Sequence, residues 1–308
     1  MKFPVTSKEV LGQGRNSFRS QLVRGQIRWL FRPFMAPSFS VSFQRTLANS
    51  LRWLLPQQTG VQTHSLDEPQ LRGDRHVPKQ GSNPGATIVY FHGGGYTLCS
   101  PASHRSLTRM IAHVTGLMVH VPQFRLAPEH PYPCQLEDAM AAIEALERQG
   151  YAVPNMVFAG DSTGAHLALT LAIARKDLCL SLPSSLVLIS PCVDWSLKDL
   201  PNESKDALLD PGWVRRSRDG HIPPSRYLES LVSPIHANLQ GLPRVLLQSA
   251  SAELFALEAE RLYVSLVASG VPVIWQEWQG LWHDFQMHAA LVPEGRDAIG
   301  RMARFLNA

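Results

Sequence analysis

Short apolar runs alternate with longer helical stretches along most of the chain after residue 85. The runs are rich in β-branched and aromatic residues, a composition typical of buried strands. They lie at Ala86–His92, Leu117–Pro122, Asn155–Gly160, Ser185–Ser190, Arg244–Ala250 and Val271–Trp278. Helices are predicted between and after them at His104–Thr115, Gln135–Arg148, Thr163–Arg175, Ala252–Ala268 and Arg296–Leu306. This alternation predicts the α/β class, with a mostly parallel sheet covered by helices on both faces.

The first part of the chain has a different pattern. Apolar side chains recur at near-helical spacing from Phe18 to Phe34, with arginines on another side, and Phe43–Leu55 predicts a second helix. Residues 56–85 are polar and rich in Gly, Pro and Gln, but this segment is too short to separate two independent domains. The pattern therefore predicts a helical cap segment at residues 1–55.

A second irregular region interrupts the alternating part. Residues 199–226 carry no strand signal and include an expected helix around Leu208–Arg218. A length of 308 residues suits one α/β domain with additions. We therefore expect a single catalytic domain at residues 56–308, with a second cap element at about 199–226.

Composition and charge add two constraints. Hydrophobic residues make up 44% of the chain and charged residues 18%, which favours a globular protein with a large core and argues against disorder. The net charge of +4 is uneven, because residues 1–64 hold nine Lys or Arg and one acidic residue. A solvated helix face is the ordinary interpretation of such a basic segment, and an anionic lipid surface or an acidic partner is the alternative.

The four cysteines, Cys99, Cys134, Cys179 and Cys192, have no spacing typical of a metal site. They predict free thiols in a reducing, cytoplasmic compartment. No apolar run reaches the roughly 18 residues of a membrane span, and the N-terminal residues lack the apolar core of a secretory signal. We expect a cytoplasmic protein without a membrane span.

A serine stands between two glycines in Gly160-Asp161-Ser162-Thr163-Gly164. The pentapeptide follows a predicted strand and opens a predicted helix, which is the frame of a nucleophile elbow. Only glycines fit beside the serine in so tight a turn, and the helix N-terminus favours negative charge that develops there. The frame predicts that Ser162 is a nucleophile.

A serine hydroxyl needs a base to become a good nucleophile. His283 lies in a loop after the last predicted strand, where a base is expected if the order along the chain is serine, acid, histidine. We interpret the other histidines, such as His166, His236 and His288, as satisfied core or surface residues.

The acid that orients this histidine is expected after the strand Arg244–Ala250. Glu253 is the first carboxylate there and is the preferred candidate, with Asp194 after the preceding strand as the alternative. Glu258 and Glu260 lie further into the next helix and are expected to be solvated.

Three glycines follow His92 at the end of the first apolar run. Without side chains, their backbone N–H groups can approach a substrate oxygen closely. The HGGG motif supplies such donors together with the residue after the nucleophile. The predicted oxyanion donors are the amides of Gly93, Gly94 and Thr163.

Five segments together resemble the hormone-sensitive-lipase-like esterases, bacterial family IV: YFHGGGYTLCSPASHR, FRLAPEHPYPCQLEDA, FAGDSTGAHLAL, ISPCVDW and WHDF. The resemblance covers about residues 86–305. It implies an α/β-hydrolase fold with an N-terminal helical cap, serine carboxylesterase activity on short- to medium-chain acyl esters and, in many relatives, a homodimer formed through the last strand and helix. It implies a small-molecule ester as partner, and neither a metal, an organic cofactor nor a nucleic acid.

The chain departs from the family pattern at three places. Gln123 and Phe124 replace an acid and a tyrosine, and Thr163 and Ala165 replace two small residues of the elbow. Glu253 stands where the family usually has aspartate. These changes concern substrate preference more than activity.

Apolar side chains near these motifs are candidates for a substrate pocket, although such side chains more often belong to a core. They are Phe34, Met35, Leu98, Trp195, Trp213 and Trp282.

Other functions share parts of this pattern. A hydrolase of an amide, a lactone or an acetylated metabolite would use the same site. A small-molecule receptor on the same scaffold would not need His283, whose presence argues against it. A structural or nucleic-acid-binding protein has only the basic N-terminal segment in its favour.

Overall fold

A nine-stranded sheet organises the part of the chain that the computed structural model describes, residues 6–12, 14, 16–50, 55–80 and 85–308. In spatial order the strands are β1 (Ser7–Leu11), β9 (Val273–Trp278), β8 (Arg244–Ala250), β7 (Ser185–Ile189), β6 (Met156–Asp161), β4 (Thr87–Phe91), β5 (Met118–Pro122), β3 (Leu71–Pro78) and β2 (Val61–Glu68). All pairs are parallel except β3 with its two neighbours. The six predicted strands agree with β4 to β9 within two residues at each end.

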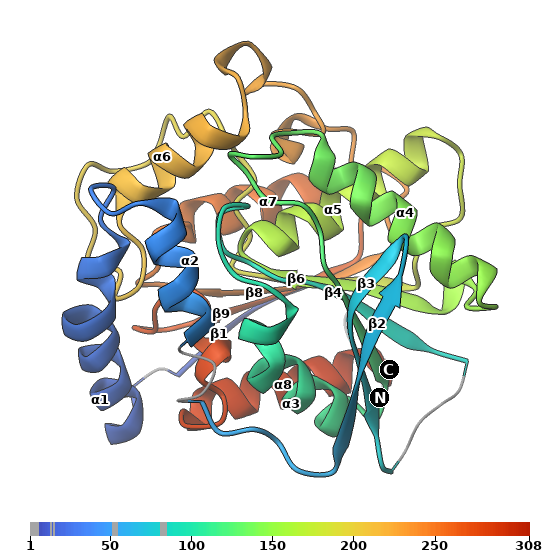
Figure 1. Ribbon diagram of the computed structural model, residues 1–308, viewed down its shortest axis with the longest axis horizontal. Coiled ribbons are helices and arrows are strands. Elements are labelled where there is room, and N and C mark those ends of the chain that lie inside the picture. The colour runs from blue at the N-terminus through green and yellow to red at the C-terminus, as the bar shows by residue number, and fades with distance from the viewer. Residues whose placement is uncertain (1–5, 13, 15, 51–54, 81–84) are drawn as a thin grey trace.

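Helices cover both faces of this sheet (Figure 1). They are α1 (Phe18–Gln26), α2 (Val41–Ser50), α3 (Arg105–Thr115), α4 (Cys134–Arg148), α5 (Thr163–Asp177), α6 (Pro211–His221), α7 (Ala256–Ala268) and α8 (Pro293–Leu306). Helices α3 and α8 lie on one side of the sheet, and α4, α5 and α7 on the other. The prediction of an α/β-hydrolase fold with helices on both faces is confirmed.

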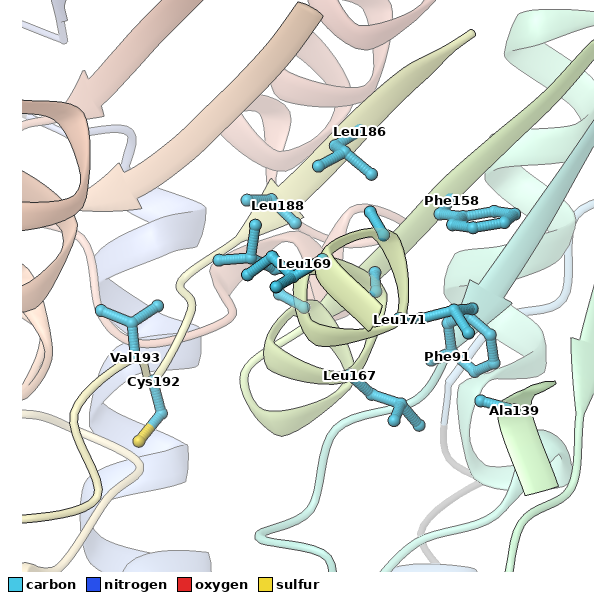
Figure 2. Close-up of a cluster of buried hydrophobic side chains, with 14 of the residues drawn as sticks. Phe91, Ala139, Phe158, Leu167, Leu169, Leu171, Leu186, Leu188, Cys192 and Val193 are labelled. Carbon is cyan, nitrogen blue, oxygen red and sulfur yellow. The ribbon is translucent and has the colours of Figure 1, made fainter. Parts of the chain in front are cut away.

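The buried strands separate two hydrophobic clusters. In β4, Val89 and Phe91 join the cluster under α4, α5 and α7, whereas Ile88 and Tyr90 join the cluster under α3 and α8. This alternation follows from the period of two in a strand, and both faces are apolar because helices cover both. Figure 2 shows leucines of α5 packed beside Phe91 and the strands β6 and β7.

Helix α5 is buried on every side from Thr163 to Arg175. A helix that is apolar all round belongs inside a core and not on a surface. Its central place fixes the position of the residue that precedes it, Ser162.

Three strands were not predicted. β2 and β3 form an antiparallel hairpin within the polar segment 56–85, and β1 lies before the predicted cap helices. Their side chains are partly exposed and mostly polar, so they lack the apolar run that marks a buried strand.

The last strand of the chain, β9, is therefore not at the edge of the sheet. β1 pairs with it in parallel from Ser7 opposite Ile274 to Leu11 opposite Trp278. A homodimer formed edge to edge on β9, as the family resemblance implies, would have to displace β1 first.

The N-terminal helices lie beside α6 in Figure 1. Between α1 and α2 the chain forms a π-helix, η1 (Ile27–Phe31), and a 3-10 helix, η2 (Arg32–Met35). The Gln44 side chain donates to the carbonyl of Phe34 at 2.8 Å and contacts the guanidinium of Arg216 in α6. Residues 51–54 of the predicted second helix lie outside the described residues.

Candidate active site

Ser162 occupies a sharp turn between β6 and α5. Its backbone angles, φ 53° and ψ −119°, lie in a region that residues other than glycine rarely adopt. The flanking glycines are required by space, because a Cβ on Gly160 would lie 2.4 Å from a carbonyl carbon and one on Gly164 2.0 Å from a carbonyl oxygen. The strand, turn and helix of a nucleophile elbow are thus present around Ser162.

His283 lies in the loop after β9 and is 1% exposed. Its Nδ1 atom lies 3.7 Å from Oε2 of Glu253, which stands in the loop between β8 and α7. This distance is too long for a hydrogen bond, and neither nitrogen of His283 has a hydrogen-bond partner among the residues that the structure describes. Ser162, Glu253 and His283 thus follow β6, β8 and β9, all at the carboxyl ends of parallel strands of one sheet.

A second carboxylate contacts the same imidazole. Oδ2 of Asp284 lies 3.0 Å from Nε2 of His283. In a catalytic triad this nitrogen accepts the hydrogen bond of the serine hydroxyl. Asp284 is 5% exposed and has φ 53°, a left-handed conformation. Asp284 was not among the predicted site residues, although it follows His283 directly in the WHDF segment.

Burial and neighbouring charges shift the pKa values of His283, Glu253 and Asp284 in opposite directions. Burial would lower the pKa of His283, but the carboxylates of Asp284 and Glu253 raise it to about 9. Burial raises the pKa of Glu253 to about 8, against the influence of His283 and of the Ser190 hydroxyl. Burial also raises the pKa of Asp284 to about 6, again against His283. The arrangement therefore favours a protonated imidazole at neutral pH.

Ser190, at the end of β7, links these parts. Its hydroxyl donates to Oε2 of Glu253 at 2.6 Å and accepts the amide N–H of Asp284 at 3.4 Å. The preceding carbonyl, of Ile189, accepts the amide N–H of Ser162 at 2.8 Å. One strand end thus connects the turn of the serine with the loops of the glutamate and the histidine.

The glycine loop after β4 packs against the elbow. The amide of Gly93 donates to Oδ2 of Asp161 at 3.2 Å, so this predicted oxyanion donor is already engaged. The hydrogen bonds of the described residues leave the amides of Gly94 and Thr163 without such a partner. Gly94 has φ +116°, which a side chain would disfavour.

Asp161 holds the glycine loop in place through its hydrogen bond from the Gly93 amide. It accepts the hydroxyl of Tyr90 at 2.6 Å and contacts Nε2 of His104 at 3.1 Å, all in buried positions. Burial would raise the pKa of Asp161, but His104 and the hydrogen bonds lower it. The ion pair therefore keeps Asp161 ionised as an acceptor for the Gly93 amide. No motif in the sequence predicted this network.

The alternative acid, Asp194, is engaged elsewhere. Its Oδ2 atom lies 2.9 Å from the guanidinium of Arg261, and its Oδ1 accepts the hydroxyl of Ser196. Glu253 is therefore the carboxylate of the two that contacts His283.

The expectation that Glu258 is solvated was wrong. Its side chain is buried and accepts the amides of Val193 and Asp194 at 2.6 and 3.1 Å. Burial raises its pKa to about 8. Helical spacing alone did not reveal this, because the amides come from the loop after β7.

The three histidines that were not expected to act as the base differ in their burial. His166 is buried, with its ring nitrogens at 2.6 Å from the Tyr96 hydroxyl and 2.7 Å from the Val232 carbonyl. His288 is half-buried and His236 is exposed. The contacts of His283 with Glu253, Asp284 and the Phe255 ring involve none of these three histidines.

The six predicted pocket residues do not lie together. Met35, Leu98, Trp195 and Trp213 belong to one buried cluster, and the Trp213 ring packs against Gly95 of the glycine loop. Trp282 belongs to another cluster, beneath α1. Phe34 is 39% exposed and packs with Phe39 and Phe43, at ring-centroid distances of 5.8 and 6.2 Å.

Three further observations concern metal ligands, membrane spans and thiols. The described part of the chain contains no group of three or more His, Cys, Asp or Glu side chains arranged to hold a metal ion. Among the described helices, none has both the length and the apolar character needed to cross a bilayer. All four cysteines have free thiols.

Comparison with known proteins agrees with this geometry. Residues 88–287 match the family described as the alpha/beta hydrolase fold. An acetyl-hydrolase of Streptomyces hygroscopicus is 36% identical over 225 residues, 72% of this chain and 75% of that protein. An esterase of Acinetobacter venetianus is 31% identical over 295 residues, 94% of either chain.

The likeness to a solved structure covers nearly the whole chain. The crystal structure of an esterase from the bacterial hormone-sensitive lipase family has a TM-score of 0.87 with this fold at 28% identity, covering 95% of this chain and 98% of the other. The chain therefore belongs to the hormone-sensitive-lipase-like esterases of the α/β-hydrolase superfamily.

Proposed function

We propose that this carboxylic ester hydrolase cleaves short- to medium-chain acyl esters through a triad of Ser162, His283 and Glu253. The observation that carries the proposal is the end of β7, where the Ile189 carbonyl bonds to the Ser162 amide and the next residue, Ser190, bonds to Glu253, with His283 against that glutamate. It supports a serine nucleophile, because such a group needs a nearby base and an acid that orients it.

In the proposed reaction the Ser162 hydroxyl attacks the ester carbonyl carbon. His283 accepts the proton from Oγ and gives it to the departing alkoxide, which leaves as an alcohol. Water then attacks the acyl-enzyme, with His283 as base again, and releases the carboxylic acid. For the first step, Nε2 of His283 must face Ser162 and not Asp284.

Two backbone amides are suited to hold the oxyanion of the tetrahedral intermediate. They are those of Gly94 and of Thr163, the residue after the nucleophile. The Gly93 amide would contribute only if its bond to Asp161 opened. In other hydrolases, loss of one such donor costs about 3–4 kcal/mol of transition-state stabilisation.

The acyl or alcohol group is proposed to contact the cluster of Met35, Leu98, Trp195 and Trp213. The acetyl-hydrolase name of one relative supports a small acyl group. A specialised acetylated metabolite, an amide or a lactone would pass through the same kind of intermediate and remains the second candidate substrate class.

The test is hydrolysis of p-nitrophenyl acetate, butyrate, octanoate and palmitate by the wild type, Ser162→Ala and the control Ser42→Ala. Ser42 is exposed in α2. The triad predicts a loss of roughly 10⁴-fold or more in Ser162→Ala alone. Full activity of Ser162→Ala would refute the proposed nucleophile, and an optimum at palmitate would refute the chain-length proposal.

A panel of acetylated sugars, amides and lactones tests the substrate class. Higher kcat/KM on one of these than on every simple ester would favour the second candidate. The Ser162→Ala variant should then lose that activity as well.

A further inference from the structure

Exposed large hydrophobic side chains gather in the N-terminal helices. Seven of the fifteen found in the described residues lie between residues 18 and 43. Four of them form what we call the outer face of α1 and η1: Phe18, Leu22, Trp29 and Leu30, which are 80%, 53%, 74% and 69% exposed. Such a group of exposed apolar side chains is typical of an interaction surface.

The helical period places this face away from the core. Phe18 and Leu22 are four residues apart in α1 and so lie on one side of it, and the exposed Trp29 and Leu30 follow in η1. Val23 and Ile27 point the other way and are buried in the hydrophobic cluster beneath the helix. The exposed side chains are therefore additional to those that hold the helix in place.

The helix is also fixed by polar contacts. Glu294 of α8 accepts the amide of Ser17 at 2.7 Å and the hydroxyl of Ser20 at 2.5 Å. The guanidinium of Arg24 donates to the carbonyl of Gly280 at 3.2 Å. α1 lies at the periphery of the molecule in Figure 1, so its outer face is presented outward by a docked helix.

The charged side chains that α1 and η1 themselves carry are all positive. No acidic residue occurs between Glu9 and Asp67. Arg19 is exposed, and the guanidinium of Arg28 lies 5.8 Å from the Trp29 ring centroid. Neither arginine has an ion-pair partner within the segments that the structure describes.

The positive charge of Arg19 and Arg28 favours an anionic membrane over a second copy of the chain as the partner of this face. A second copy of the chain that docked face to face would bring Arg19 and Arg28 of both copies together without a carboxylate to balance them. A membrane with anionic headgroups offers opposite charge to both arginines and an apolar layer for the tryptophan and leucines. Tryptophan in particular prefers the boundary between headgroups and acyl chains.

We propose that the outer face of α1 and η1 docks the protein on membranes that contain anionic lipid. The aromatic and leucine side chains enter the boundary between headgroups and acyl chains, and Arg19 and Arg28 contact the headgroups. The folded protein binds in this way through side chains already exposed, with no helix crossing the bilayer.

Co-sedimentation with sucrose-loaded vesicles of DOPC/DOPG (1:1) and of DOPC alone tests this, using the full chain at low and at 0.5 M salt. The wild type should sediment with DOPC/DOPG, much less with DOPC, and less at high salt. Trp29→Ser with Leu30→Ser should lower the partition coefficient about tenfold or more. Arg19→Gln with Arg28→Gln should lower it about fivefold per arginine on DOPC/DOPG only.

The matched control is Leu257→Ser with Val264→Ser in α7, two side chains 51% and 59% exposed. It should bind as the wild type does. Equal binding by the Trp29 and Leu30 variant, an equal loss in the control, or no preference for DOPG would overturn the proposal. Light scattering completes the test: a dimer of the wild type that this variant lacks would show a self-association surface instead.

Discussion

Asp284→Asn should shift the pH dependence of catalysis toward lower pH. The wild-type carboxylate lies 3.0 Å from Nε2 of His283 and, with a pKa of about 6, is mostly ionised at neutral pH. An ionised neighbour stabilises the imidazolium, which cannot act as a base. The amide has nearly the same shape without the charge, so the imidazolium loses this stabilisation and the pKa of His283 falls.

The geometry gives the size of the shift. Unit charges 3.0 Å apart attract by about 5 kcal/mol at an effective dielectric constant of about 20. One pKa unit corresponds to about 1.4 kcal/mol, so this attraction sets an upper limit of about four units. Charges this close usually shift a pKa by about one to three units. From a pKa of about 9, the variant's imidazole should titrate between about pH 6 and pH 8.

The assay is kcat/KM for a p-nitrophenyl ester between pH 5 and pH 10. The acidic limb should move down by about one to three units, which raises activity at pH 7 roughly tenfold or more. Asp194→Asn, which removes another buried carboxylate that pairs with Arg261, should leave the limb in place. An unmoved or upward-shifted limb in Asp284→Asn would refute the electrostatic reasoning.

Three other substitutions test the support around the site. Ser190→Ala removes a hydrogen bond from the Glu253 carboxylate and should lower kcat about 10- to 100-fold with little change in KM, measured by steady-state kinetics. Gly164→Ala forces a Cβ to 2.0 Å from the Phe91 carbonyl oxygen and should lower the free energy of unfolding by about 1–3 kcal/mol or more in urea titrations. Arg45→Ala removes bonds to the Thr97 and Ala127 carbonyls and should speed proteolysis within α2, whereas an unchanged cleavage rate would count against this anchor.

The buried part of the sheet could be predicted because apolar content alone marks it. Strands such as β6 and β7 are buried at every position, so a continuous apolar run gives their bounds. β1, β2 and β3 carry polar side chains, and only their pairing partners make them strands. That pairing is a long-range property which a local pattern does not contain.

The candidate site also contains residues that motifs predict and contacts that depend on the folded loops. Motif order predicted the positions of Ser162, Glu253 and His283, because each stands at a fixed place after a predicted strand. The contacts of Asp284 and Ser190 could not be predicted, since they depend on how the loops after β7 and β9 approach each other. The burial of Glu258 depends on a loop contact of the same kind.

The pairing of β1 with β9 has a consequence for the order of assembly. Glu9 of β1 bonds to Gln276 of β9, 267 residues later in the chain. During synthesis, β1 has no partner until nearly the whole domain has been made, and such distant contacts form late. We infer that α1, which follows β1 directly, docks last, after the strands that precede Ser162, Glu253 and His283 have been made.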